Sequence, residues 1–219
     1  MNRKKIVALI MVVALALTTL IGGTLAYFTD TDDATNTFVM GNVDIELDEA
    51  DVEKDGYNYV ALPETEDTPR VQHNDYENLW PGQVIPKDPV ITNVGSTDAW
   101  IRAKIQTTTN ELATIVDLQP GESVLTEEAI EKAVNIQEGW TYAGYEVVSV
   151  DGANLTVNFI YTYDYIVEPK QEVTLFTEVT IDKDVEDQGF SFNIDVKAEA
   201  IQTPGLPTVE AAWNAFDGV

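Results

Sequence analysis

The sequence predicts an all-β protein, an antiparallel jelly-roll-like sandwich with one short inserted helix, preceded by a cleaved signal peptide. Three observations lead to this prediction: an apolar run near the start, many short alternating segments separated by turn residues, and one segment with helical periodicity. An immunoglobulin-like sandwich is the second choice of architecture. We expect residues 27–219 to form a single domain, because a chain of this length can bury a sufficient core.

The first 26 residues have the layout of a secretory signal peptide. Basic residues at positions 3–5 precede an almost unbroken apolar run over residues 6–21. Two glycines end the run, and Thr24 and Ala26 then place small residues at −3 and −1 of a cut before Tyr27. The alternative is a membrane anchor, for which the run is short of the ~20 residues that a bilayer requires. Cleavage between Ala26 and Tyr27 predicts a secreted protein, with signal peptidase as its partner during export.

The charge of the chain limits its partners. The chain has 12 Lys and Arg against 38 Asp and Glu, a formal net charge of −26 at pH 7. Cleavage removes three cations, which leaves 12 − 3 = 9 basic and 38 acidic residues and a charge near −29. We therefore expect no nucleic acid as a partner, and no membrane after cleavage. The chain has no Cys, which excludes thiolate metal sites and thiol nucleophiles.

The N-terminal half contains several strand patterns. Residues 27–36 are polar and predicted to be extended, and apolar residues alternate with acids over 43–47, the period of a strand with one buried face. Asp55-Gly56 predicts a hairpin turn before residues 57–60. An acidic surface loop follows over 62–75, and two strands are predicted at 90–94 and 99–105, around a tight polar connection.

The one convincing helix lies at 126–134, where Thr126 is a suitable N-cap and acidic residues occupy the first turn. The chain is strand-dense from Trp140 onward, with a turn at Asp151-Gly152. The apolar tail over 211–216 is predicted to be helical and docked. Alternating tyrosines predict a packed strand face, with a sugar-binding platform as the alternative, at Tyr161, Tyr163 and Tyr165.

No catalytic constellation is present in the sequence. The single histidine, His73, lies in a polar loop. One histidine cannot supply the two that a His-Glu-x-x-His zinc site requires. A Ser-His-Asp triad would have to use His73, and nothing around it resembles a nucleophile elbow. We therefore predict no enzyme activity, no catalytic residue and no cofactor-binding residue. His73 is interpreted as a solvated loop residue.

Acidic clusters leave a weak calcium hypothesis open. The spacing of Asp182, Asp184 and Glu186 imitates the start of an EF-hand loop, but the residues required at positions six and twelve are missing. A looser oxygen-ligand site remains an alternative there or near the N-terminus, at Asp30, Asp32 and Asp33. Because charge runs are usually solvated, we expect the protein to bind neither a metal nor a cofactor.

The stretch Gly-Gly-Thr-Leu-Ala-Tyr-Phe-Thr-Asp at 22–30 resembles the signal-cleavage region of the TasA/camelysin family. These are exported proteins of Gram-positive bacteria that are matured by a SipW-type signal peptidase. Further segments that are similar to the family lie at 38–45, at 79–82 together with 93–96, and at 196–202.

The resemblance implies a jelly-roll domain that polymerises into extracellular fibres of the biofilm matrix. In such fibres, the freed N-terminal segment of one subunit completes the sheet of the next subunit. By position, residues 27–47 would be this donor segment, with Phe28, Phe38 and Val39 as candidate polymerisation contacts. The alternative is that the segment folds into its own domain as a first strand.

The leading functional prediction is therefore a structural fibre protein of the extracellular matrix or cell surface. Its expected partners are further copies of itself, with minor fibre subunits as additional candidates. A monomeric cell-surface binding module or adhesin is the second hypothesis. A camelysin-type metallopeptidase is the third, although the sequence lacks the usual ligand set.

Overall fold

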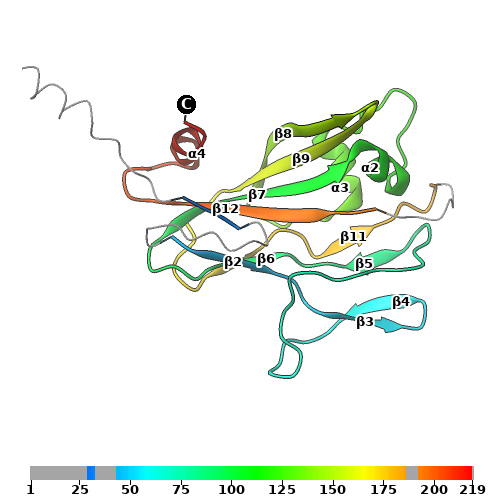
Figure 1. Ribbon diagram of the computed structural model, residues 1–219, viewed down its shortest axis with the longest axis horizontal. Coiled ribbons are helices and arrows are strands. Elements are labelled where there is room, and N and C mark those ends of the chain that lie inside the picture. The colour runs from blue at the N-terminus through cyan, green and yellow to red at the C-terminus, as the bar shows by residue number, and fades with distance from the viewer. Residues whose placement is uncertain (1–28, 33–42, 186–191, 219) are drawn as a thin grey trace, which may run out of the picture.

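The computed structural model describes residues 29–32, 43–185 and 192–218, which fold into two stacked layers of antiparallel strands (Figure 1). The upper layer is a five-stranded sheet in the order β1-β12-β7-β9-β8. The lower layer combines a three-stranded sheet, β10-β6-β2, with the pair β11-β5, and the hairpin β3-β4 projects below it (Figure 1). This arrangement confirms the predicted all-β antiparallel sandwich.

The strands are short except in the five-stranded sheet. Their bounds are β1 Thr29–Asp32, β2 Ile45–Asp48, β3 Val52–Asp55, β4 Asn58–Ala61, β5 Val84–Pro86, β6 Val90–Asn93, β7 Ala99–Thr108, β8 Trp140–Asp151, β9 Asn154–Tyr163, β10 Glu172–Thr174, β11 Glu178–Thr180 and β12 Asp195–Gln202. The predicted turn at Asp55-Gly56 joins β3 to β4, with Gly56 at φ 63°.

The described residues contain the helices α2 (Thr109–Ile115), α3 (Glu127–Ala133) and α4 (Val209–Asp217). The helix α3 is the predicted one, and the hydroxyl of Thr126 accepts a hydrogen bond from the backbone N–H of Ala129. The predicted apolar tail forms α4. The helix α2 was not predicted, although Thr108 and Glu111 form a reciprocal capping box at its start. None of these helices is long and apolar enough to cross a membrane.

The main core lies between the two layers. Alternate side chains of β7 and β9 point into it, including Ile105, Phe159 and Tyr161, all at most 1% exposed. Ile91 of β6 is fully buried in the same cluster. Burial of each such side chain stabilises the fold by about 1.5–3 kcal/mol. Buried Tyr161 confirms the packed-face interpretation at that position, whereas Tyr165 is exposed.

The predicted tight polar connection between β6 and β7 joins strands of different sheets. The side chain of Asn93, which is fully buried, holds this crossing in place. Its Nδ2 donates to the carbonyls of Thr97 and Val167, both at 2.9 Å, and its Oδ1 accepts from the N–H of Gly95 at 3.1 Å. Turn residues predict a change of direction but not the layer to which the chain returns.

The helix α4 lies over the outer face of the five-stranded sheet (Figure 1) and is held there by Arg102 of β7. The Arg102 guanidinium donates to Glu199 at 2.6 Å and to both oxygens of Asp217 at 2.8 and 2.9 Å. It also lies 4.5 Å from the ring centre of Trp213 and 5.1 Å from that of Phe216. A second, smaller core forms beneath the helix, from Trp100, Ile201, Leu206, Ala212 and Trp213.

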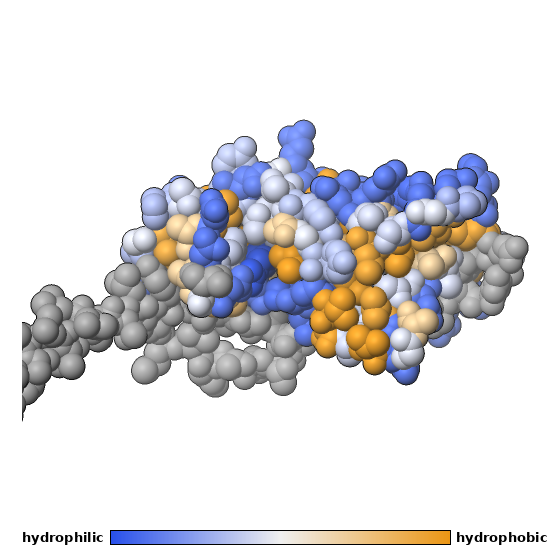
Figure 2. Space-filling view, turned by 90° about the horizontal axis from the view of Figure 1, so that it is seen from above, coloured by the Kyte–Doolittle hydropathy of each residue, from blue (hydrophilic) through white to orange (hydrophobic). Residues whose placement is uncertain are grey.

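The strand β8 is the outermost strand of the five-stranded sheet at the edge opposite β1. Its first residue, Trp140, is buried, but every residue from Tyr145 to Asp151 is exposed. The face of the molecule seen from above carries apolar residues in patches between polar ones (Figure 2). The pairing with β9 is irregular between Val147 and Ser149, so that Val148 has no partner position on β9.

The two-layer core predicts a large cost for truncating Ile105, which is fully buried. Ile105→Ala should lower the free energy of unfolding by about 2–5 kcal/mol, because it removes buried methyl groups and leaves a cavity. Val60→Ala, at an exposed position of β4, should change it by less than about 0.5 kcal/mol. Urea denaturation followed by tryptophan fluorescence measures both values, and equal effects would contradict this assignment of the core.

The ion pair between Arg102 and Asp217 predicts an acid-dependent loss of stability. Hydrogen bonds from Arg102 hold the pKa of Asp217 below its usual value, against an opposing effect of partial burial. The resulting stabilisation is fully present above about pH 5 and is lost as the pH falls through the depressed pKa. Asp217→Asn should therefore be less stable than the wild type at pH 7, and the difference should shrink on acidification. Denaturant titrations over this pH range test this, and a difference independent of pH would contradict it.

Candidate functional site

The predicted processing and contact residues, Ala26, Tyr27, Phe28, Phe38 and Val39, lie outside the described residues. Two parts of the candidate donor segment at 27–47 are described, namely β1 and residues 43–47. The candidate site is therefore built from β1 and from the surfaces that surround its pairing partner, β12.

The strand β1 pairs with β12 at the edge of the five-stranded sheet. The register runs antiparallel from Thr29 opposite Ile201 to Asp32 opposite Ala198. Over these residues the N-terminal segment pairs with its own domain. Because β12 begins at Asp195, the stretch from Asp195 to Lys197 lies beyond the end of β1.

A groove of about 530 Å³ lies beside this stretch of β12. One wall comes from the start of β12 and the other from the end of β2, so the groove opens between the two layers of the sandwich. Leu47, Pro89 and Val196 contribute apolar surface. The remaining lining is polar, from Asp48, Glu49, Gln72, His73, Lys87, Asp195 and Lys197. A groove that offers both apolar and polar surface next to a strand edge is suited to an extended peptide segment.

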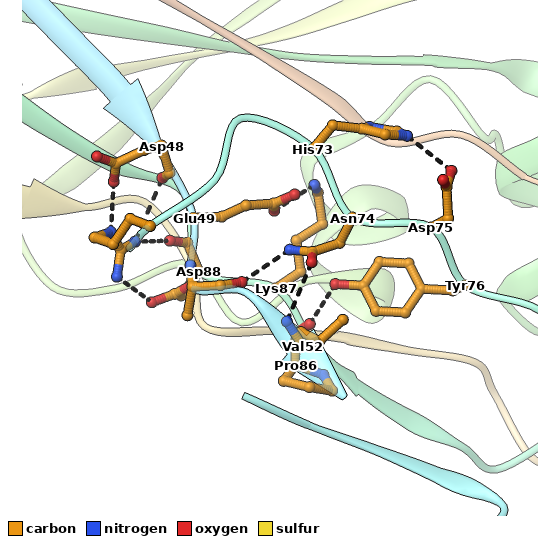
Figure 3. A network of polar contacts seen from close by, with 12 residues as sticks. Asp48, Glu49, Val52, His73, Asn74, Asp75, Tyr76, Pro86, Lys87 and Asp88 are labelled. Atoms are coloured by element: carbon orange, nitrogen blue, oxygen red, sulfur yellow. Dashed lines mark hydrogen bonds and ion pairs between the residues drawn. The ribbon is translucent and has the colours of Figure 1, made fainter. Parts of the chain in front are cut away.

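Arg70 fixes the wall of the groove formed by β2, through contacts with Asp48 and Asp88, which are labelled in Figure 3. Its guanidinium bonds the side chain of Asp48, the Asp88 carboxylate at 3.1 Å and the Asp88 carbonyl at 2.9 Å. Burial lowers the pKa of Arg70, but the two carboxylates outweigh this effect and the net change is upward. Arg70 therefore stays charged and ties the end of β2 to the segment that follows β5.

A second ion pair lies deeper, between Glu49 and Lys87 (Figure 3). Glu49 is only 3% exposed, and its Oε2 lies 2.7 Å from the Lys87 ammonium nitrogen. Its Oε1 is buried and has no hydrogen-bond partner among the described residues. Burial, followed by the charges of Glu49 and Asp88, raises the pKa of Tyr76, whose hydroxyl donates to the carbonyl of Pro86 at 2.6 Å. The side chains of Glu49 and Tyr76 in this wall are thus largely buried, and the carboxylates of Glu49 and Asp88 give their surroundings a negative potential.

The single histidine lies at the rim of this groove. The His73 side chain is 70% exposed, and its Nε2 lies 2.9 Å from Asp75 Oδ1. His73 also borders a second, more polar groove of about 500 Å³, which includes Tyr76 and Phe192. Its exposure agrees with the interpretation as a solvated loop residue.

The acidic clusters form no metal site among the described residues, where no group of three or more His, Cys, Asp or Glu side chains could hold an ion. Asp182 accepts a hydrogen bond from the backbone N–H of Asp184 at 2.9 Å, and the Asp184 carboxylate pairs with Lys183. Glu186 and Asp33 lie outside the described residues. The calcium hypothesis therefore stays a prediction.

The fold and this edge define a class of protein: a two-layer antiparallel β-sandwich whose N-terminal segment pairs along the edge of a sheet. Residues 2–55 match the family described as camelysin metallo-endopeptidase. This match, which runs to the end of β3, supports the assignment of the chain to the TasA/camelysin family. No curated protein matches the chain, and no solved structure matches it.

The family description names a metallopeptidase, an activity that would require a catalytic zinc site. Such a site takes three protein ligands from His, Cys, Asp or Glu. The only histidine, His73, has Asp75 as its polar partner, and no third ligand gathers beside them in the described part of the chain. The described residues therefore do not fit a catalytic metal centre.

Sequence reasoning did not identify the groove or its two ion pairs. Lys87 and Asp88 stand together in a segment without other charges, which was a signal for paired charges. Their partners were not predictable from the sequence, because Glu49 lies 38 residues before Lys87 and Arg70 lies 18 residues before Asp88.

The Glu49–Lys87 pair predicts an asymmetric response to mutation. Lys87→Met should lower the free energy of unfolding by about 3 kcal/mol, because the Glu49 carboxylate is left buried without its counter-ion. Adding Glu49→Gln to this variant should recover part of the loss, since the uncompensated charge disappears. Lys183→Met, which removes an exposed ion pair, is the matched control and should leave the free energy of unfolding nearly unchanged. Urea titrations at pH 7 measure all three, and equal losses at positions 87 and 183 would contradict a structural role for the buried pair.

Proposed function

We propose that this chain is an exported structural protein that polymerises into extracellular fibres by N-terminal donor-strand exchange. The observation that supports this most directly is the pairing of β1 with the β12 edge, next to a groove that continues along the same edge. The family match covers the same N-terminal region.

The pairing seen within one chain can be made equally well between two chains. The backbone hydrogen bonds of an antiparallel ladder are the same whether the added strand is local or comes from a neighbour. In a donor strand that keeps the register of β1, residues 33–35 of the neighbour would lie opposite Lys197 to Asp195. That stretch of β12 borders the groove, so the donor gains apolar contacts with Val196 and Leu47 as well as hydrogen bonds.

Exchange at this edge builds filaments rather than closed pairs. The donor segment and the acceptor edge are different surfaces, so each added subunit presents a new donor or a new acceptor. The expected partners are further copies of the chain and minor fibre subunits, and signal peptidase acts during export. Cleavage before Tyr27 would release the donor segment, which places the protein outside the cell, in the matrix or at the cell surface. The proposed role is structural rather than enzymatic.

The charge of the chain makes this assembly dependent on ionic strength. Copies whose formal net charge after cleavage is near −29 (9 basic against 38 acidic residues) repel one another over distances comparable with the Debye length, about 8 Å at physiological ionic strength. Added salt should therefore promote polymerisation by screening this repulsion.

A monomeric cell-surface binding module of the same fold is the second candidate. The observation in its favour is that β1 pairs with β12 of its own chain. In that case, the groove beside β12 would receive a segment of a different molecule, and the purified protein would remain monomeric under all ionic conditions.

Removal of the donor segment tests the polymerisation proposal. The chain beginning at Tyr27 should form fibres that are visible by electron microscopy, whereas the chain beginning at Met40 should remain soluble with an unchanged circular dichroism spectrum. Fibre growth by the shorter chain at the same rate would exclude donor-strand exchange.

A point substitution in the groove tests the acceptor surface. Val196→Lys places a charge on its apolar wall and should slow fibre growth at least tenfold, an estimate of about 1.4 kcal/mol lost from each added contact. Val60→Lys, at an exposed position of the β3-β4 hairpin, is the matched control and should leave growth unchanged. Light scattering on the chain beginning at Tyr27 gives both rates. Equal rates for Val196→Lys and the wild type would exclude this groove as the acceptor.

A further inference from the structure

We propose that the outer half of β8, from Tyr145 to Asp151, is a second self-association surface, at which two copies of this chain pair antiparallel about a two-fold axis. This surface lies at the opposite edge of the five-stranded sheet from β1. It is therefore separate from the acceptor edge of the proposed fibre contact.

The first observation is the unpaired backbone edge. Among the described residues, β8 pairs with β9 alone, and it ends the five-stranded sheet. The outward backbone groups of an edge strand are available for pairing with another strand. The outer half of β8 contains no proline, which would interrupt such a ladder.

The second observation is the character of the exposed side chains. Tyr145 is 46%, Val147 45%, Val148 51% and Val150 67% exposed. Valine and tyrosine strongly favour strands, and exposed edge strands in soluble proteins usually carry charges that prevent association. From Val147 to Val150 this edge carries no charge.

The charge of the molecule indicates that the partner at the outer half of β8 is a second copy of this chain. A basic partner would find no carboxylate to pair with between Val147 and Val150, although the chain as a whole is strongly acidic. Two copies repel one another over most of their surfaces, and the cost of approach is lower where both present an uncharged strand. A two-fold axis brings this uncharged segment opposite itself.

The positions of the flanking acids select a register. Pairing centred on Val148 places Val147 opposite Ser149 of the second copy and Glu146 opposite its Val150. Tyr145 then faces Asp151, so no carboxylate faces another. A shift that places Glu146 opposite Asp151 would bring like charges together, which is unfavourable for cross-strand neighbours. Val148 is the centre of the preferred register and has no partner position on β9.

This contact has a different outcome from donor-strand exchange. A two-fold pair closes after two copies, whereas exchange along β12 continues without limit. The pairing of β8 itself does not depend on the proposed function. If the proposed fibres form, β8 pairing would join neighbouring filaments side by side.

Disulfide trapping tests the contact directly, because the chain contains no cysteine of its own. Residues directly opposite in an antiparallel pair have Cβ atoms about 4.5–5.5 Å apart, close enough for a disulfide after a small adjustment. Val148→Cys in the chain beginning at Tyr27 should give a disulfide-linked dimer under mild oxidation. Val94→Cys, at a position of similar exposure on the loop after β6, should cross-link at least about tenfold more slowly. Equal rates at the two positions would overturn the proposal.

A charge substitution provides the second measurement. Val148→Lys places two like charges at the centre of the pair and should raise the dimer dissociation constant about tenfold or more. Sedimentation equilibrium on the chain beginning at Met40 separates this contact from donor-strand exchange, because this chain lacks most of the donor segment. As a control for folding, the circular dichroism spectrum of this chain must match that of the chain beginning at Tyr27. Concentration-dependent dimers that are weakened by Val148→Lys and unaffected by Val94→Lys support β8 pairing. A strictly monomeric chain, or equal weakening by both substitutions, overturns it, whether or not the longer chain forms fibres.

Discussion

Unsatisfied backbone hydrogen bonding at the edges of an open sheet is the constraint on which this structure depends. A β-sandwich buries its side chains between two layers, but each sheet still ends in a strand with unpaired backbone groups. Here the five-stranded sheet has β1 covering part of β12 at one edge, and β8, which carries no charge from Val147 to Val150, at the other. Both proposals follow from the same constraint, since each edge can be completed by another chain.

Polar interactions fix the crossing between the two layers and the arrangement of segments within the lower layer. Asn93 connects the loop after β6 with the carbonyl of Val167, and Arg70 connects the end of β2 with Asp88. Such buried groups contribute to stability only while all partners are present, because an unpaired polar group in a low-dielectric interior is costly. They therefore restrict how the walls of the groove beside β12 can move, which favours a preformed acceptor over one created on binding.

Local patterns in the sequence predicted the elements that local physics determines. The alternation around Ile45, the cap at Thr126 and the turns at Gly56 and Gly152 all lie where they were expected. The strands β6 and β7 and their polar connection were predicted, but their place in different sheets was not, because the five residues between them fit a hairpin as well as a crossing between layers. The groove was beyond sequence reasoning, since its walls bring β2 together with a strand about 150 positions later. The predicted contacts at Phe28, Phe38 and Val39 lie outside the described residues and stay predictions.

The pairing of β12 with β7 has a mechanical consequence. The two strands are joined through eight registered residue pairs, and Arg102 binds Glu199 across them while holding α4 on the outer face. If a neighbouring subunit paired along the side of β12 that faces away from β7 pulls in the strand direction, the force acts in shear on the whole ladder at once. Strands loaded in shear must break many hydrogen bonds together, whereas strands loaded at one end open one bond at a time. A filament built on this edge would therefore resist extension most strongly along the direction of β12.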